Sequence, residues 1–230
     1  MIKPSKIYKM RIVFHLAADA PGRTDIVGLL RTMILKSGLP FARAKQNHSV
    51  PRIAYGPGIK RGQFAEREYA ELYLFTSVSV QKARARLEAC KPQGFTFLDC
   101  QRIPFALAGV QQLASVVEYK IQGDFASYTP KQTLENYVAS ARLEVAHLAP
   151  DGLMQTINIK PFVRQAHQLG ATQVQVLLNR VDERWLSPLE LLGAWLGEDL
   201  CAGENAADER FKITRQGLYW QDSQNNLYLI

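Results

Sequence analysis

The N-terminal half of the chain alternates between strand-like and helix-like segments, and the order of these segments limits the folds that it can form. Residues 6–16 alternate apolar with polar side chains, which predicts a half-buried strand. Thr24 or Asp25 can cap the helix that follows, and the stretch from Gly38 to Pro40 ends it. The later segments are strand-like residues at 41–45 and 51–56, a strand at 68–76, a helix at 79–91, a strand at 95–103 and a short helix at 105–114.

A similar order recurs in the C-terminal half and predicts a second unit with the same topology. Thr129 caps a helix that Pro130 opens, and Ser187 caps a later helix with Pro188 at its first position. The predicted elements are a strand from residue 116, the helix after Pro130, a hairpin over 143–159 that turns at 150–152, a helix at 160–170, a strand at 172–179, the helix at 187–197 and a final hairpin of residues 211–221 and 226–230.

The order β-α-β-β-α-β is that of ferredoxin-like units. The sequence therefore predicts an α+β fold in which two ferredoxin-like units pack together, followed by a C-terminal helix and a β-hairpin. The expected domains are residues 1–114 with a basic loop, residues 115–200 with the second unit and its helix, and residues 201–230 with a polar linker and the hairpin.

Positive charge is concentrated in the N-terminal third. No acidic residue lies between Asp25 and Glu66, and the loop in this interval also contains glycines that let a backbone approach a ligand closely. Such a loop can bind phosphate groups, and amide, imidazole or phenol side chains can add hydrogen bonds or stacking. A solvated charged loop is the alternative. The candidate residues for RNA or phosphate binding are Arg43, Lys45, Asn47, His48, Arg52, Tyr55, Lys60 and Arg61.

Other residue patterns argue against several classes of protein. The cysteines Cys90, Cys100 and Cys201 are far apart, which predicts reduced thiols in a cytoplasmic protein and no iron–sulfur cluster. The four histidines are scattered, so we expect no metal and no cofactor. No nucleophile elbow, phosphate-binding loop or dinucleotide fingerprint is present. Charges interrupt every apolar run, so we expect no membrane span.

Several segments together resemble the radical SAM-linked domain, a bacterial family of unknown biochemical function that occurs alone or attached to radical SAM enzymes. The resemblance covers residues 8 to 220 and depends on the succession and spacing of its segments. These are MRIVFHL, DIVGLLRTMILKSGLPFA, PRIAYGPGIKRG with the following EYAELYL, INIKPFV, VQVLLN and SPLELLGAWLG.

The chain departs from the family's polar motifs. Members carry Leu-Ser-His-Leu-Asp before the first helix, where this chain has PGRTDI and keeps Asp25. Their polar loop has Gln-Gly-Phe-Asn-Pro-His-Pro-Lys, where this chain has QNHSVPR and keeps Pro51 with a basic residue at Arg52. If those polar residues hold a ligand in the family, this chain binds an altered ligand or none.

The function that we expect is that of an accessory, non-catalytic protein that binds tRNA or ribosomal RNA and works with a separate radical SAM RNA-modification enzyme. Two alternatives stay open: an RNA-modifying or RNA-processing enzyme in its own right, and a protein–protein adaptor. The absence of a recognisable catalytic or cluster-binding motif favours a protein that is not an enzyme. The sequence does not indicate the oligomeric state.

Overall fold

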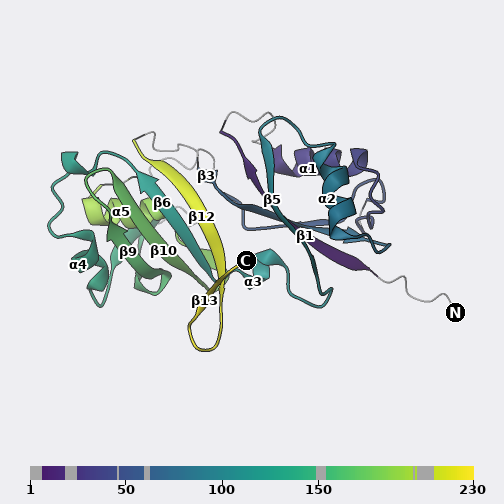
Figure 1. The fold of residues 1–230 in the computed structure, drawn as a ribbon. Helices are drawn as coiled ribbons and strands as arrows, with labels where there is room; N and C mark the ends of the chain where they lie inside the picture. The colour runs from purple at the N-terminus through teal and green to yellow at the C-terminus, as the bar shows by residue number, and fades with distance from the viewer. Residues whose placement is uncertain are drawn as a thin grey trace. The chain divides into compact units, whose positions relative to one another are not determined.

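The computed structural model describes residues 7–18, 25–45, 47–59, 63–148, 154–198, 200 and 210–230. The chain divides into two compact units (Figure 1). The first unit consists of Met1–Gly58 and Ala65–Leu113, and the second of Ile59–Phe64 and Ala114–Ile230. Helices and strands occur in both units, so the protein has a mixed α+β fold.

The first unit has a four-stranded antiparallel sheet in the order β2-β4-β1-β5. Its elements are β1 (Tyr8–Leu16), α1 (Ile26–Lys36), β2 (Ile53–Tyr55), β4 (Glu68–Leu74), α2 (Val80–Glu88), β5 (Phe95–Ile103) and α3 (Val110–Leu113). The predicted helices and central strands are confirmed. The predicted strand at 41–45 is wrong, because this segment makes only isolated bridges at Phe41 and Arg43. The predicted helix at 105–114 is limited to α3.

Helices α1 and α2 pack on one face of the sheet of the first unit. Leu30 and Leu87 of the helices join Ile12 and Leu72 of the strands in one buried core. Asp25 is the N-cap of α1 and accepts a hydrogen bond from the Gly28 backbone, while Thr24 lies outside the described residues. These caps and apolar positions explain why the helices form where their periodicity predicts them.

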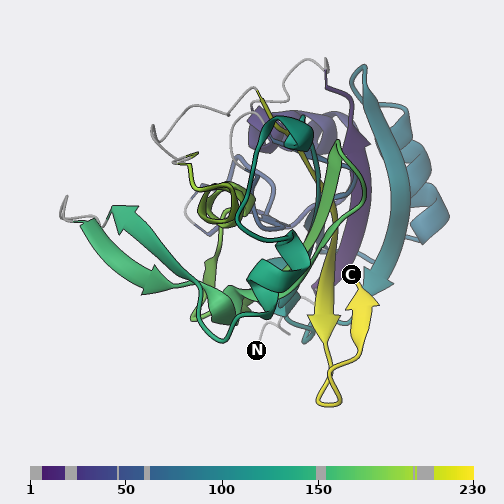
Figure 2. The same cartoon turned by 90° about the vertical axis from the view of Figure 1, so that its left-hand side faces the viewer.

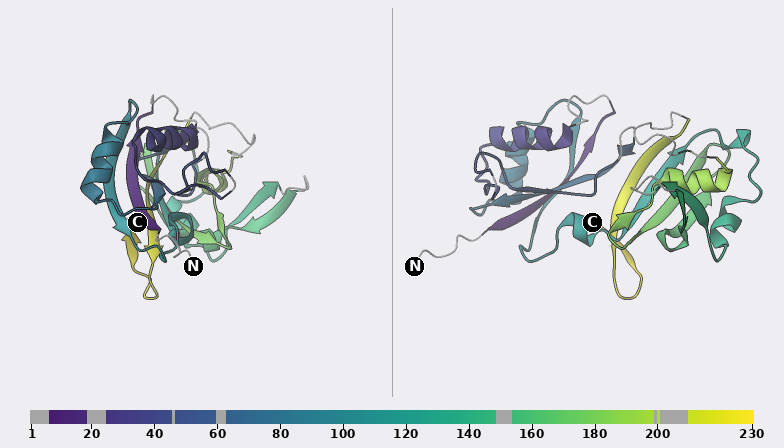
Figure 3. Two further views of the ribbon diagram at one scale, coloured as in Figure 1. Left: turned by 90° about the vertical axis from the view of Figure 1, so that its right-hand side faces the viewer. Right: turned by 180° about the vertical axis from the view of Figure 1, so that it is seen from behind.

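The main sheet of the second unit has the order β11-β10-β6-β12-β13, and two more strands pair off this path, β9 with β10 and β3 with β12. Helix α5 lies against one face of this sheet (Figure 3), and β7 and β8 form a separate two-stranded ribbon (Figure 2). The elements are β3 (Phe64–Ala65), β6 (Val116–Gln122), α4 (Leu134–Ala139), β7 (Glu144–Leu148), β8 (Met154–Asn158), β9 (Val163–Gln168), β10 (Gln173–Val181), β11 (Arg184–Trp185), α5 (Pro188–Leu196), β12 (Lys212–Gln221) and β13 (Leu227–Leu229).

The helix predicted at 160–170 is wrong. A short 3₁₀ turn at Lys160–Phe162 leads into β9, which pairs antiparallel with β10. The turn between the two strands contains Gly170, whose φ of +119° suits glycine and few other residues. The second unit therefore does not repeat the predicted β-α-β-β-α-β order, because cross-strand pairing replaces the second helix.

Of the two helix N-termini predicted in the second unit, the first is wrong and the second is confirmed. Thr129 and Pro130 do not open α4, whose N-cap is Thr133. Ser187 does cap α5, in a capping box with Glu190 and with Pro188 in the first turn. The C-terminal hairpin is confirmed as β12 and β13, while the predicted linker at 201–209 lies outside the described residues.

Candidate nucleic-acid interface

The predicted basic loop begins as an exposed excursion between Arg43 and Pro51, which form a bridge. Asn47 closes its turn by accepting a hydrogen bond from the Ser49 backbone at 2.9 Å. The side chains at the tip stay in solvent, since Arg43, Lys45, Asn47 and His48 are all exposed.

The other predicted site residues have different surroundings. Arg52 and Tyr55 are half-buried, and Lys60 and Arg61 lie outside the described residues. Burial raises the pKa of Tyr55, against the lowering effect of the Arg31 guanidinium on α1. Tyr55 is therefore directed toward α1, and the structure does not gather all the predicted residues into one surface.

Arg52 belongs to an aromatic cluster that the sequence did not reveal. Its guanidinium carbon lies 4.1 Å from the ring centre of Tyr73 and 6.0 Å from that of Phe105. The two rings meet edge to face, with centres 6.2 Å apart. Such contacts hold the Arg52 side chain over the aromatic rings. Phe105 is 52% exposed, so part of its ring remains open to a ligand.

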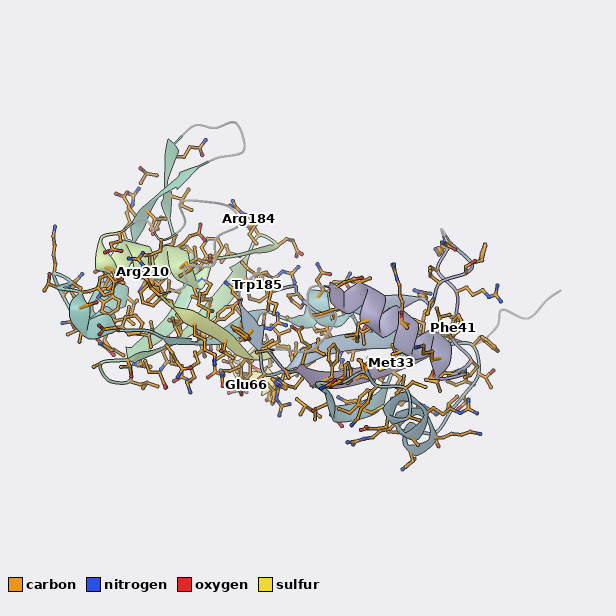
Figure 4. The ribbon with its side chains drawn as sticks, turned by 90° about the horizontal axis from the view of Figure 1, so that it is seen from above. Met33, Phe41, Glu66, Arg184, Trp185 and Arg210 are labelled. Atoms are coloured by element: carbon orange, nitrogen blue, oxygen red, sulfur yellow. The ribbon has the colours of Figure 1, made fainter. Side chains whose placement is uncertain are left out.

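The cluster lies at one end of the first unit's sheet. Antiparallel pairing of Lys9 with both Tyr73 and Ile103 brings the ends of β4 and β5 to the start of β1. Phe41, labelled in Figure 4, pairs with Leu74 at the same end. The residues of this surface, which we call the aromatic end, are Arg52, Tyr73, Phe75 and Phe105.

Phe75 extends the aromatic end, whereas Arg102 and Tyr8 lie at the same end of the sheet on its helix-covered face. The Arg102 guanidinium lies 5.7 Å from the Tyr8 ring centre and donates hydrogen bonds to Ser77 Oγ at 2.9 Å and to the Val78 carbonyl at 2.7 Å. Phe75 is 55% exposed. The aromatic end thus presents open aromatic rings beside the anchored guanidinium group of Arg52.

The pKa of Tyr73 is raised, first by burial and then by the nearby carboxylate of Glu71, while Arg52 opposes the shift. Its hydroxyl therefore stays protonated at neutral pH and can donate a hydrogen bond. Because the Tyr73 hydroxyl is neutral, it does not compete with a phosphate for the positive charge of Arg52.

A buried ionic cluster supports the segment that carries Phe105. The Lys9 ammonium contacts Glu71 Oε2 at 2.9 Å and donates to the Leu107 carbonyl at 2.8 Å. Arg11 contacts the other carboxylate oxygen of Glu71 at 2.9 Å. Lys9 is 2% exposed and Glu71 is fully buried. The cluster ties residues 105–109 to the sheet and so fixes the position of Phe105.

Sequence reasoning missed most of the aromatic end because its residues come from three distant segments. The polar side of strand 6–16 was expected to face solvent, yet Lys9 and Arg11 are buried there. A signal was available in Phe105, an apolar residue just after the alternating strand at 95–103.

Other candidate chemistry is sparse in the described parts of the chain. No group of three or more histidine, cysteine, aspartate or glutamate side chains there could hold a metal ion. Burial, with a smaller effect of Asp99, raises the pKa of the Cys100 thiol to about 11. Cys90 is half-buried, and Cys201 lies outside the described residues. No described helix has the length and apolar character needed to cross a membrane.

Comparisons with known proteins identify the family. Comparison with curated proteins gives no match. The model of a family described as an uncharacterized protein conserved in bacteria (DUF2344) matches residues 10–188. The matched segment runs from β1 to the start of α5 and covers well over half of the chain. The chain therefore belongs to this bacterial family of uncharacterized proteins.

Proposed function

We propose that this protein is a non-catalytic accessory protein that binds tRNA or ribosomal RNA in the cytoplasm. The observation that carries the proposal is the aromatic end, where Phe105 is 52% exposed beside the anchored Arg52. Unpaired bases stack on aromatic rings and guanidinium planes, and arginines bind the adjoining phosphates. The exposed Arg43 and Lys45 add positive charge to the same unit.

The topology of the first unit gives the proposal a further basis. Its β-α-β-β-α-β order and β2-β4-β1-β5 sheet support a ferredoxin-like unit, an arrangement that RNA-binding domains use among many others. Those domains stack bases on aromatic residues in the middle of the sheet. Here the corresponding Tyr69 is 2% exposed and the Lys9–Glu71–Arg11 cluster is buried. RNA would therefore bind at the end of the sheet rather than across its centre.

We further infer that a separate radical SAM enzyme supplies the chemistry, as the resemblance to radical SAM-linked domains implies. The C-terminal hairpin offers this partner an exposed aromatic surface. Trp220 and Tyr228 stack with ring centres 4.8 Å apart on the C-terminal hairpin and are 39% and 44% exposed. Residues 216–230 contain no lysine or arginine, so this hairpin suits a protein partner better than RNA.

Binding of a labelled single-stranded RNA, measured by fluorescence anisotropy at low salt, tests the proposal. Phe105→Ala should weaken binding by about tenfold, since stacking of one base contributes roughly 1–3 kcal/mol. Phe105→Leu keeps the apolar bulk but not the ring and should be nearly as weak. Arg52→Ala should also weaken binding, and Arg184→Ala, which removes an exposed charge from the second unit, is its matched control (Figure 4). The proposal fails if the wild-type protein binds no RNA at low salt.

A further inference from the structure

The outer surfaces of α1 and α2 are basic and almost free of acidic side chains. The two helices contain five lysine or arginine residues and one acidic residue, Glu88. Leu35 is the only large apolar side chain exposed on the described helices. The surface that we call the basic helix face consists of Arg31, Lys36, Lys82, Arg84 and Arg86.

Lys36 and Lys82 carry the charge of this face that is most accessible to a ligand. Glu88 lies 2.8 Å from Lys91 and 3.9 Å from Arg84, so its charge is shared between two cations. Lys36 and Lys82 are exposed and have no ion-pair partner among the described residues. A face of this composition attracts phosphates and offers no aromatic ring on which a base could stack.

Two hydrogen bonds connect the basic helix face to the aromatic end. Arg86 on α2 donates a hydrogen bond to the Gly38 carbonyl, just beyond α1, at 2.8 Å. Two residues later, the Pro40 carbonyl accepts a hydrogen bond from the Phe75 backbone at 3.0 Å. Helix α2 begins soon after Phe75, at Val80. Lys36 precedes Pro40 by four residues and Lys82 follows Phe75 by seven, so both lie within about two helical turns of the Pro40–Phe75 contact along the chain.

The two surfaces suit different parts of one RNA. The aromatic end needs unstacked bases, which occur only in single-stranded segments. The basic helix face can contact phosphates alone, which is how double-stranded RNA is mostly bound, because side chains cannot read the deep groove of an A-form helix.

We propose that the RNA partner of this protein is a duplex with an adjoining unpaired segment, and that the basic helix face binds the duplex phosphates while the aromatic end binds the unpaired bases. This inference rests on the RNA binding proposed above. It names the structural class of the RNA and adds Lys36 and Lys82 as phosphate-binding residues.

Three labelled RNAs test the inference: a single strand, a blunt duplex, and the same duplex with a single-stranded overhang. The overhang RNA should bind at least about tenfold more tightly than either of the others, because two linked contacts reinforce one another. The double variant Lys36→Ala/Lys82→Ala should weaken binding of both duplex RNAs by about tenfold at 0.1 M salt and leave the single strand unchanged. Phe105→Ala should weaken the single strand and the overhang RNA but not the blunt duplex.

The matched control is Lys131→Ala/Arg184→Ala, which removes two exposed charges from the second unit. The inference is overturned if this control and the Lys36/Lys82 variant have the same effect, or if the overhang RNA binds no better than the single strand. In either case, binding of the single strand would leave the proposed function intact. Failure of all three RNAs to bind would instead contradict the proposed function itself.

Discussion

Glu71 neutralises two buried cations, and no other acidic side chain among the described residues is as completely enclosed. Glu71→Gln keeps the shape of the side chain but leaves Lys9 and Arg11 without a buried counter-charge. Breaking a buried ion pair in this way costs about 3–5 kcal/mol, so the free energy of unfolding in urea should fall by about that amount. Glu144→Gln is the control, because the Arg142–Glu144 pair has side chains 70% and 49% exposed. Loss of such a pair should change stability by less than about 1 kcal/mol. Equal stability of the two variants would show that the buried cluster is not a structural anchor.

The Cys100 thiol offers a second test at the scale of one residue. Since burial raises its pKa to about 11, almost none of it is thiolate at neutral pH. In a variant with Cys90→Ser and Cys201→Ser, reaction with a disulfide reagent should be slow at pH 8 and should keep accelerating as the pH rises through 10. A rate that reaches its plateau below pH 9 would contradict the raised pKa. Addition of denaturant should remove the protection and serves as the internal control.

Part of the candidate site could be predicted from the types of its residues alone. Charge counting located the basic segment, and Arg52 does lie at the proposed interface. Tyr73 and Phe105 could not be found in this way, because their meeting depends on the pairing of β1 with both β4 and β5. Sequence spacing predicts which face of a strand a residue occupies, but not which loop covers that face.

At the level of helices and strands, β9 shows that the spacing of apolar residues does not distinguish a short helix from a short strand. The segment 160–170 is short and mixes apolar with polar residues, so its pattern fits a helix or a strand. Pairing with β10 decides the outcome, and burial of Val163 and Ala166 against the sheet accompanies it. Longer segments with caps, such as α1 and α5, were predicted correctly because local signals and packing agree there.

The β9–β10 turn provides a test of this assignment. Gly170 has φ +119°, so Gly170→Ala should destabilise the protein by about 1–3 kcal/mol through backbone strain. Gly58→Ala is the matched control, since no atom within 4 Å opposes an added Cβ there. Thermal unfolding of both variants measures the difference. The strand assignment would lose its support if Gly170→Ala melted at the same temperature as Gly58→Ala.

At the scale of the whole molecule, the two units differ in surface chemistry. The basic helix face and the aromatic end both belong to the first unit, whereas the exposed Trp220 and Tyr228 belong to the second. We therefore propose that the first unit binds RNA and that the second docks on the enzyme. A bridging protein of this kind raises the effective concentration of substrate at the enzyme without adding chemistry.

Enzyme docking has its own test in the native host. Wild-type protein should co-purify with a radical SAM enzyme and increase modification of the RNA. Trp220→Ala/Tyr228→Ala should lose the complex, since exposed tryptophan and tyrosine often dominate binding energy, while keeping RNA affinity. Recovery of no complex, together with equal modification in its absence, would remove the accessory role.

The salt dependence of RNA affinity distinguishes phosphate contacts from base stacking at the aromatic end. For a single-stranded RNA, the plot of log affinity against log salt concentration should have a negative slope of about 0.7 per phosphate contacted. Arg52→Ala should reduce the magnitude of that slope by about 0.7, whereas Phe105→Ala should lower affinity at every salt concentration with the slope unchanged. Arg184→Ala should change neither quantity. Slopes and affinities that are the same for all four proteins would contradict RNA binding at the aromatic end.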